Sequence, residues 1–168
     1  MGTIEPLATS PISDLQIVLA KFLAALTFYV ILWAPTVLYF MMFLLSTGER
    51  SAAPIGAIGS SYLILFLMGM FYLAIGCFAS VVTRNQIIAA VVSFALIILV
   101  FFSGLLAIII PNSTPMFRDL FVYFSAFEHL GDFSKGIIDS RPIVFYLTMT
   151  AFVLYLTLQV FQYRKWRS

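Results

Sequence analysis

Few side chains in this sequence could take part in catalysis or metal binding. Most of these side chains lie in one segment. Glu128, His129 and Asp132 combine carboxylate and imidazole groups, which many metal ions accept as ligands. Adjacent residues on a helix point in different directions, however, so Glu128 and His129 are poorly placed to share one ion. We therefore predict a solvated polar face here, with no metal ligand and no catalytic residue.

Motifs of nucleotide and zinc chemistry are absent from the sequence. It contains no GxxxxGK loop to cradle phosphates and no HExxH pair to bind zinc. The single cysteine, Cys77, stands inside an apolar stretch and is expected to be a small core residue. We expect no enzymatic activity and no cofactor in this chain, so any ATP and Mg²⁺ would have to be bound by a partner.

The composition excludes several classes of protein. Of the 168 residues, 62% are hydrophobic and 10% are charged, whereas soluble domains have about 45–50% apolar and about 25% charged residues. The mean hydropathy of +1.08 also excludes a disordered chain. The net charge is only +2 and no long basic run is present, so nucleic acid is not an expected partner. A protein embedded in the lipid bilayer is the remaining class.

Four stretches are long and apolar enough to cross a hydrocarbon core of roughly 30 Å as helices. Backbone polar groups in lipid must be satisfied within the segment, and these stretches are too long for barrel strands. The predicted spans are residues 14–45, 57–82, 86–110 and 142–163. We therefore predict an all-α integral membrane protein in which residues 1–168 form a single transmembrane domain.

Local signals define the ends and the shape of the predicted helices. Ser13 and Gln16 have the spacing of a capping box, which predicts a helix start near residue 14. The first helix is longer than the bilayer is thick, and Pro35 is expected to kink it. Pro142 is well placed in the first turn of the last span.

Small side chains recur at helical spacing in the second and third spans, where they would let neighbouring helices approach closely. The polar residues 83–86 between these spans predict a tight antiparallel hairpin. The candidates for helix packing are Gly69, Gly76, Ser80, Ala89 and Ser93.

Residues 111–141 are more polar than the spans but keep an apolar stripe. Phenylalanine and leucine recur there at helical spacing, at positions 117, 120, 121 and 124. We expect an outer segment that lies at the membrane interface or partly re-enters the membrane. Gly131 and Gly136 are expected to end its helical part.

The apolar parts of the spans contain no Asp, Glu, Lys, Arg or His. Proton and ion relays normally need such groups, so a proton-coupled transporter and an intramembrane hydrolase are disfavoured. The interior is instead rich in aromatic residues. These are expected mainly to pack between helices and against lipid, and a path for a hydrophobic or amphiphilic substrate is the alternative.

Basic residues near the ends of the spans favour a cytoplasmic location for both termini. Four spans place both termini on one side of the membrane. That side would carry Lys21, Arg84, Arg164, Lys165 and Arg167, and the other side would carry Arg50, Arg118, Lys135 and Arg141.

Three segments resemble, in order along the chain, the type-2 ABC-transporter permeases, especially the gliding-motility and copper-maturation permeases. They are residues 2–25, residues 74–86 and residues 127–139. The resemblance implies the transmembrane permease subunit of an ATP-driven exporter in a bacterial plasma (inner) membrane. It also implies two partners, an ABC ATP-binding subunit and a second permease copy or half.

Permeases of this family have six transmembrane helices, so the resemblance implies that this chain holds the last four and is truncated at its N-terminus. Residues 1–13 would then be the cytoplasmic loop that couples the permease to the ATPase. The candidate coupling residues are Gly2, Thr3, Ile4 and Glu5. Pro6 departs from the leucine that is common in relatives, and it would begin or interrupt a coupling helix.

A second interpretation gives the chain no transport activity of its own. In that case it is a membrane scaffold or accessory subunit that packs into a larger complex through its small residues. Stimulated ATP hydrolysis in an intact complex would distinguish the exporter from the scaffold.

Overall fold

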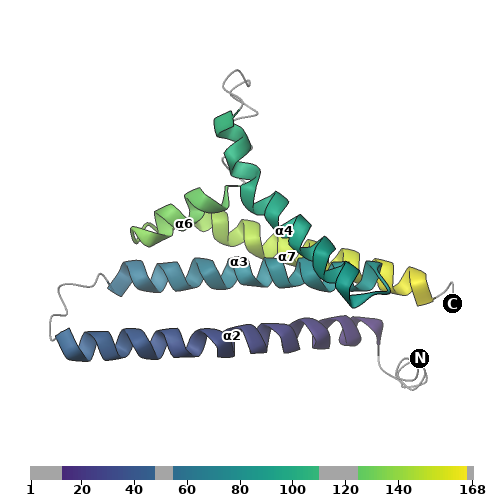
Figure 1. Ribbon diagram of the computed structural model, residues 1–168, viewed down its shortest axis with the longest axis horizontal. Coiled ribbons are helices and arrows are strands. Elements are labelled where there is room, and N and C mark those ends of the chain that lie inside the picture. Colours follow the sequence, from purple (N-terminus) through teal and green to yellow (C-terminus); the bar gives the residue numbers. More distant parts are fainter. Residues whose placement is uncertain (1–12, 48–54, 110–124, 166–168) are drawn as a thin grey trace.

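The computed structural model describes residues 13–47, 55–109 and 125–165, and every regular element in these ranges is a helix (Figure 1). The helices are α2 (Asp14–Thr47), α3 (Ile55–Val82), α4 (Gln86–Ile109), α6 (Ala126–Ser134) and α7 (Ser140–Lys165). Within the described ranges, α2, α3, α4 and α7 are long and apolar enough to cross a membrane. The predicted all-α membrane fold with four spans is confirmed.

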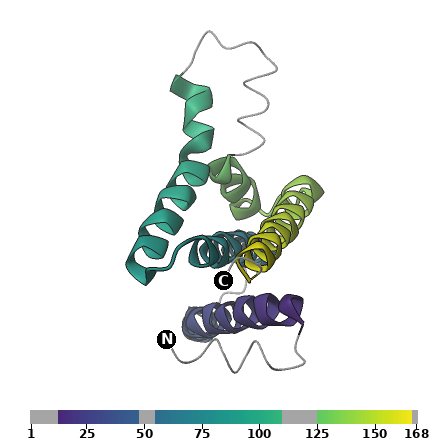
Figure 2. The ribbon, with the colours of Figure 1, turned by 90° about the vertical axis from the view of Figure 1, so that its right-hand side faces the viewer.

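Helix α3 is the centre of the bundle, because it packs against each of the other described helices. Figure 2 shows α2 on one side of α3 and α6 on the other. The start of α2 and the end of α7 lie at the same end of the molecule, where α3 also turns into α4 (Figure 1). Helix α6 lies toward the opposite end.

Helix α2 begins with the predicted capping box. The Ser13 N–H donates to Gln16 Oε1 at 3.0 Å, and the Gln16 N–H donates to Ser13 Oγ at 3.4 Å. The helix then continues through Pro35 for 34 residues, a length of about 51 Å at 1.5 Å per residue. It therefore exceeds the roughly 30 Å thickness of the hydrocarbon core, as the sequence predicts.

A short turn joins α3 to α4 and forms the predicted hairpin. The Thr83 hydroxyl donates to the Ala79 carbonyl at 2.9 Å, and Asn85 Oδ1 accepts the Ile87 N–H at 2.9 Å at the start of α4. From this turn α4 runs away from the long axis of the bundle (Figure 1). None of its span over Gln86–Ser103 is buried within the described part of the chain.

The core lies where α3, α6 and α7 meet. Its buried side chains are Ile64, Leu67, Met68, Phe71, Ile75, Ala126, Phe133, Phe145 and Tyr146. Helices in lipid are held together by close packing and by hydrogen bonds between them, and this junction is the larger packed cluster among the described residues.

Helix α6 belongs to the segment that the sequence places outside the spans. Ser125 caps its start by accepting the Glu128 N–H at 3.4 Å, and Gly136 follows its end with a φ of 81°. The expectation that Gly131 also ends the helix is wrong, because α6 continues through it to Ser134. The apolar stripe at positions 117–124 lies outside the described residues.

Helix α7 starts with its own cap. Asp139 Oδ1 accepts the Arg141 N–H at 3.0 Å, and Pro142 occupies the first turn as predicted, where its missing N–H costs no helical hydrogen bond.

Candidate functional site

A buried polar cluster lies at the junction of α6, α3 and α7. His129 of α6 is only 8% exposed, and its Nδ1 lies 3.3 Å from the hydroxyl oxygen of Tyr146 on α7, which is 2% exposed. The His129 ring also contacts Phe145, at a centroid distance of 6.2 Å. The predicted solvated face is therefore wrong for His129.

The pattern of α6 explains this placement. Ala126, His129 and Phe133 follow one another at intervals of three and four residues and form the buried face of the helix, while Glu128 and Asp132 are exposed. An amphipathic helix that docks on the bundle turns one face inward, and His129 stands on that face. In the described part of the chain no group of three or more potential ligands could hold a metal ion.

A second tether holds α6 against α3. The hydroxyl of Ser60, which is 3% exposed, donates to the carbonyl of Phe133 at 2.6 Å. The Phe133 side chain is completely buried. On its other side α6 contacts α4, where the rings of Phe127 and Phe101 lie 4.6 Å apart.

Tyr72 of α3 adds an unusual polar atom to this region. Its buried hydroxyl is the one buried side-chain oxygen or nitrogen without a hydrogen-bond partner among the described residues. Its ring lies beside Phe71, which in turn contacts Tyr146. An unpaired buried hydroxyl costs free energy, so this position is less well satisfied than its neighbours.

Burial lowers the pKa of His129 below its usual value, because the charged ring would lose its hydration. The carboxylates of Asp132 and Asp139 act in the opposite direction and only partly offset the effect of burial. His129 is therefore neutral at pH 7.

A second candidate feature is an aromatic groove between α2 and α3 with a volume of about 200 Å³. It is lined by Tyr29, Val30, Trp33, Tyr62, Leu65 and Phe66. The Tyr29 hydroxyl donates to the Leu65 carbonyl at 3.0 Å, and the Tyr62 hydroxyl donates to Thr36 Oγ1 at 3.1 Å. Because both hydroxyls are used inside the protein, the groove presents mainly apolar surface.

The predicted packing residues have different surroundings. Gly69 is buried, and a Cβ added there would lie 2.4 Å from a ring carbon of Tyr29, so this glycine makes room for α2. A Cβ added at Gly76 would meet no atom of the described residues within 4 Å. Ala89 and Ser93 are half-buried, and the Ser93 hydroxyl donates to the Ala89 carbonyl of its own helix at 2.7 Å.

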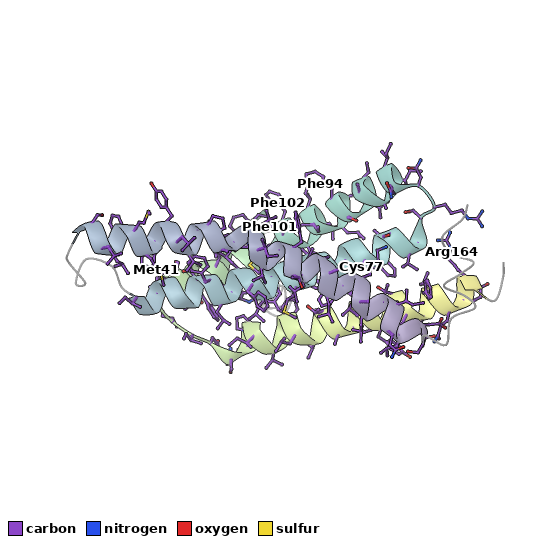
Figure 3. All side chains as sticks on the ribbon, turned by 90° about the horizontal axis from the view of Figure 1, so that it is seen from below. Met41, Cys77, Phe94, Phe101, Phe102 and Arg164 are labelled. Carbon is purple, nitrogen blue, oxygen red and sulfur yellow. The ribbon has the colours of Figure 1, made fainter. Side chains whose placement is uncertain are left out.

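Two basic side chains meet the last turn of α3. Lys21 Nζ donates to Ser80 Oγ at 2.6 Å, and the Arg164 guanidinium donates to the Val81 carbonyl. Cations are favourable there because the last carbonyls of a helix carry partial negative charge. Arg164 reaches this turn from the end of α7, whereas Cys77 is buried farther inside the bundle (Figure 3). Sequence reasoning counted both cations for orientation but did not pair them with α3.

Comparison with known proteins adds one finding. A sequence model of the family described as "ABC-2 family transporter protein" matches residues 1–166. No curated protein and no solved structure gives a match. The candidate coupling residues Gly2, Thr3, Ile4 and Glu5 fall inside the matched range but outside the described residues.

Proposed function

This chain belongs to the ABC-2 transporter family, and we propose that it is the permease subunit of an ATP-driven exporter. The observation that carries the proposal is the family match over residues 1–166, which spans all four membrane-crossing helices. Family membership supports a membrane transporter subunit in general. The direction of transport and the source of energy are parts of the proposal.

The proposed motor is a separate ABC ATP-binding subunit that supplies the ATP and Mg²⁺. This chain has no GxxxxGK loop, so it requires such a partner if transport uses ATP. We propose that residues 1–13, with Gly2, Thr3, Ile4 and Glu5, contact that subunit. The start of α2 follows directly, and Lys21 links α2 to the last turn of α3.

The proposed path for substrate has an uncharged lining. The groove between α2 and α3 is apolar and aromatic, and no charged residue stands in its vicinity along either helix. Such a surface suits a hydrophobic or amphiphilic molecule. A second permease copy or half would complete the path in the bilayer.

We propose that the end of the bundle with the start of α2 faces the cytoplasm of a bacterial cell, across its plasma membrane. The cations of the described residues at that end are Lys21, Arg84, Arg164 and Lys165. The opposite end has Lys135 and Arg141 together with the acidic residues of α6 and the α6–α7 connection. Cytoplasmic ends of membrane proteins carry the excess of Lys and Arg.

Co-purification with an ATP-binding subunit tests the proposal. The chain is co-expressed in bacteria with a GxxxxGK-containing ABC subunit from the same genome, extracted in mild detergent and captured by a tag on the permease. We expect the ATPase to be recovered, and ATP hydrolysis in lipid nanodiscs to be higher with the permease than without it.

The variant Glu5→Lys should reduce ATPase recovery several-fold, because it reverses the charge of a proposed contact. Glu128→Lys is the matched control, since it makes the same change on exposed α6 near the opposite end. Repeated capture without any ATPase would contradict the exporter. Capture of an ATPase whose hydrolysis never responds to the permease would favour the scaffold instead.

A further inference from the structure

We propose that α6 is a pH-dependent latch: neutral His129 keeps α6 seated against α3 and α7, and protonation of the ring releases α6 from the bundle. The latch lies outside the four spans and is independent of which substrate the permease carries.

The geometry makes His129 the sensitive point of this junction. Its ring is 8% exposed and is packed against the aromatic rings of Phe145 and Tyr146, with the Tyr146 hydroxyl as its hydrogen-bond partner. A neutral imidazole suits these surroundings, since it can either donate to or accept from a hydroxyl. A charged ring would lose most of its hydration there, and no described residue forms an ion pair with it, so the charge would be costly.

The titratable and charged groups on each neighbouring element support this reading. On α6 and the α6–α7 connection, the carboxylates of Asp132 and Asp139 act on the ring, whereas Glu128 and Lys135 are exposed and do not. Helix α7 contributes Tyr146 and, in its exposed first turn, Arg141. Helix α3 contributes the Tyr72 hydroxyl near Tyr146.

Helix α4 contributes no titratable group, because its sequence contains none. Among the described residues, the carboxylates that act on the ring are Asp132 and Asp139, and the hydroxyl of Tyr146 stands on the buried side. A proton on the ring is therefore better accommodated when α6 leaves its buried position against α3 and α7.

The rest of α6 is held lightly enough for such a release. The helix has nine residues, and its attachments among the described residues are the buried face of Ala126, His129 and Phe133, the ring contact of Phe127 with α4, and the bond from Ser60 to the Phe133 carbonyl. Helices this short are not stable in isolation, so α6 depends on its docked face. Changing the charge of one of three buried residues alters a large share of that attachment.

The direction of the pH effect follows from linkage. Burial lowers the pKa of His129 in the docked state, whereas the ring of released α6 titrates near the ordinary value of about 6.5. The docked state is therefore fully favoured above about pH 6.5 and loses stability as the pH falls below it. Below about pH 6.5, each further drop of one pH unit lowers the ratio of docked to released α6 by up to about tenfold. This continues until the pH reaches the pKa of His129 in the docked state.

Hydrogen exchange measures the release directly. The full chain is placed in nanodiscs of phosphatidylcholine, and the protection of amides 126–134 is compared between pH 7.5 and pH 5, after correction for intrinsic exchange rates. We expect the protection of the α6 amides to be lower at pH 5, by a factor set by the difference between the pKa of His129 in the released and docked states, while amides in the middle of α3 and α7 keep their protection. His129→Gln stays neutral and can still bond to Tyr146, so its α6 protection should not change with pH.

Titration of the histidine supplies a second readout that does not depend on the folding of a variant. The chain has one histidine, so the NMR signal of a ¹³C-labelled imidazole is unambiguous. We expect it to titrate below about 6.5. Asp132→Asn should lower the pKa of His129 further, because it removes a carboxylate that favours the charged ring. Glu128→Gln is the matched control, since it removes the same charge from an exposed site on α6 that does not act on the ring.

Two results would overturn the latch. One is a histidine that titrates at or above 6.5 in the folded protein. The other is an α6 whose protection falls with acid as much in His129→Gln as in the parent chain. In that case another group would carry the pH response.

Discussion

Gly69 and Gly76 are seven residues apart on α3, yet an added methyl group would meet different surroundings at each position. At Gly69 it would lie 2.4–2.6 Å from the end of the Tyr29 ring. That ring is held by its hydrogen bond to the Leu65 carbonyl and by an edge contact with Trp33. At Gly76 it would meet open space within the described part of the chain.

Gly69→Ala should therefore destabilise the folded chain by about 1–3 kcal/mol, because Tyr29 must leave its place. Gly76→Ala should be neutral or stabilise it by up to about 1 kcal/mol, since alanine favours a helix more than glycine does. The measurement is the free energy of unfolding in mixed micelles, followed by circular dichroism as the fraction of sodium dodecyl sulfate rises. Equal effects of the two substitutions would contradict the contact between Tyr29 and Gly69.

At the scale of elements, the attachment of α6 to α3 depends on one hydroxyl that crosses between them. Ser60 Oγ has carbonyls of its own helix within reach at 2.9 and 3.0 Å, but its shortest bond goes to Phe133 on α6. The neighbouring Ser61 bonds only to the Ala57 carbonyl of α3, at 2.7 Å, and so serves as a matched control.

Ser60→Ala should weaken the docking of α6 by about 0.5–1.5 kcal/mol, because it removes one hydrogen bond while the Phe133 carbonyl still accepts the Gly136 N–H at 3.0 Å. Exchange of the α6 amides at pH 7.5 should accelerate by up to about tenfold, with α7 unaffected. Ser61→Ala should leave α6 exchange unchanged. If both variants accelerated exchange alike, the effect would come from α3 itself rather than from the tether.

The sequence predicts features that depend on a few neighbouring residues. The capping box of Ser13 and Gln16, the turn before α4 and the four apolar helices are of this kind, because hydrophobicity and capping act locally. The buried position of the His129 side chain could not be predicted in this way. Whether a polar residue on a short amphipathic helix meets water or protein depends on which surface the helix docks against, and that surface is formed by distant parts of the chain.

The contact at Gly69 is an intermediate case. The small size of Gly69 predicts a close approach of a neighbouring helix. Only the structure identifies Tyr29 as the side chain that occupies the space. The same pattern flags Gly76, where an added Cβ would meet no neighbour among the described residues. Spacing alone therefore does not separate a contact within one chain from a surface left for another.

At the scale of the whole molecule, the alternating directions of the long helices place residues near the two ends of the bundle on opposite sides of the membrane. Ser134 at the end of α6 and Gln86 at the start of α4 are both exposed and lie toward different ends. Ser125 is unsuitable as a probe because it is buried and caps α6.

Single cysteines at Ser134 and Gln86, in a Cys77→Ala background, should therefore label differently in intact cells. A membrane-impermeant maleimide should modify Ser134→Cys from outside the cell. It should modify Gln86→Cys only after the cells are opened, because we propose that the positive end faces the cytoplasm. Labelling of Gln86→Cys alone in intact cells would reverse the proposed orientation.

Helix α4 has a consequence for how the molecule sits in lipid. Apart from its first residue, Gln86, it is almost entirely apolar, and it contains no Lys, Arg, Trp or Tyr, the residues that fix a helix at the level of the headgroups. Its vertical position is therefore set by the Arg84–Asn85 turn and by its contacts with α3 and α6 rather than by anchors of its own. A thicker or thinner bilayer should change the tilt of α4 more than the tilt of α2 or α7. The helices of this chain should therefore differ in how strongly they respond to membrane thickness.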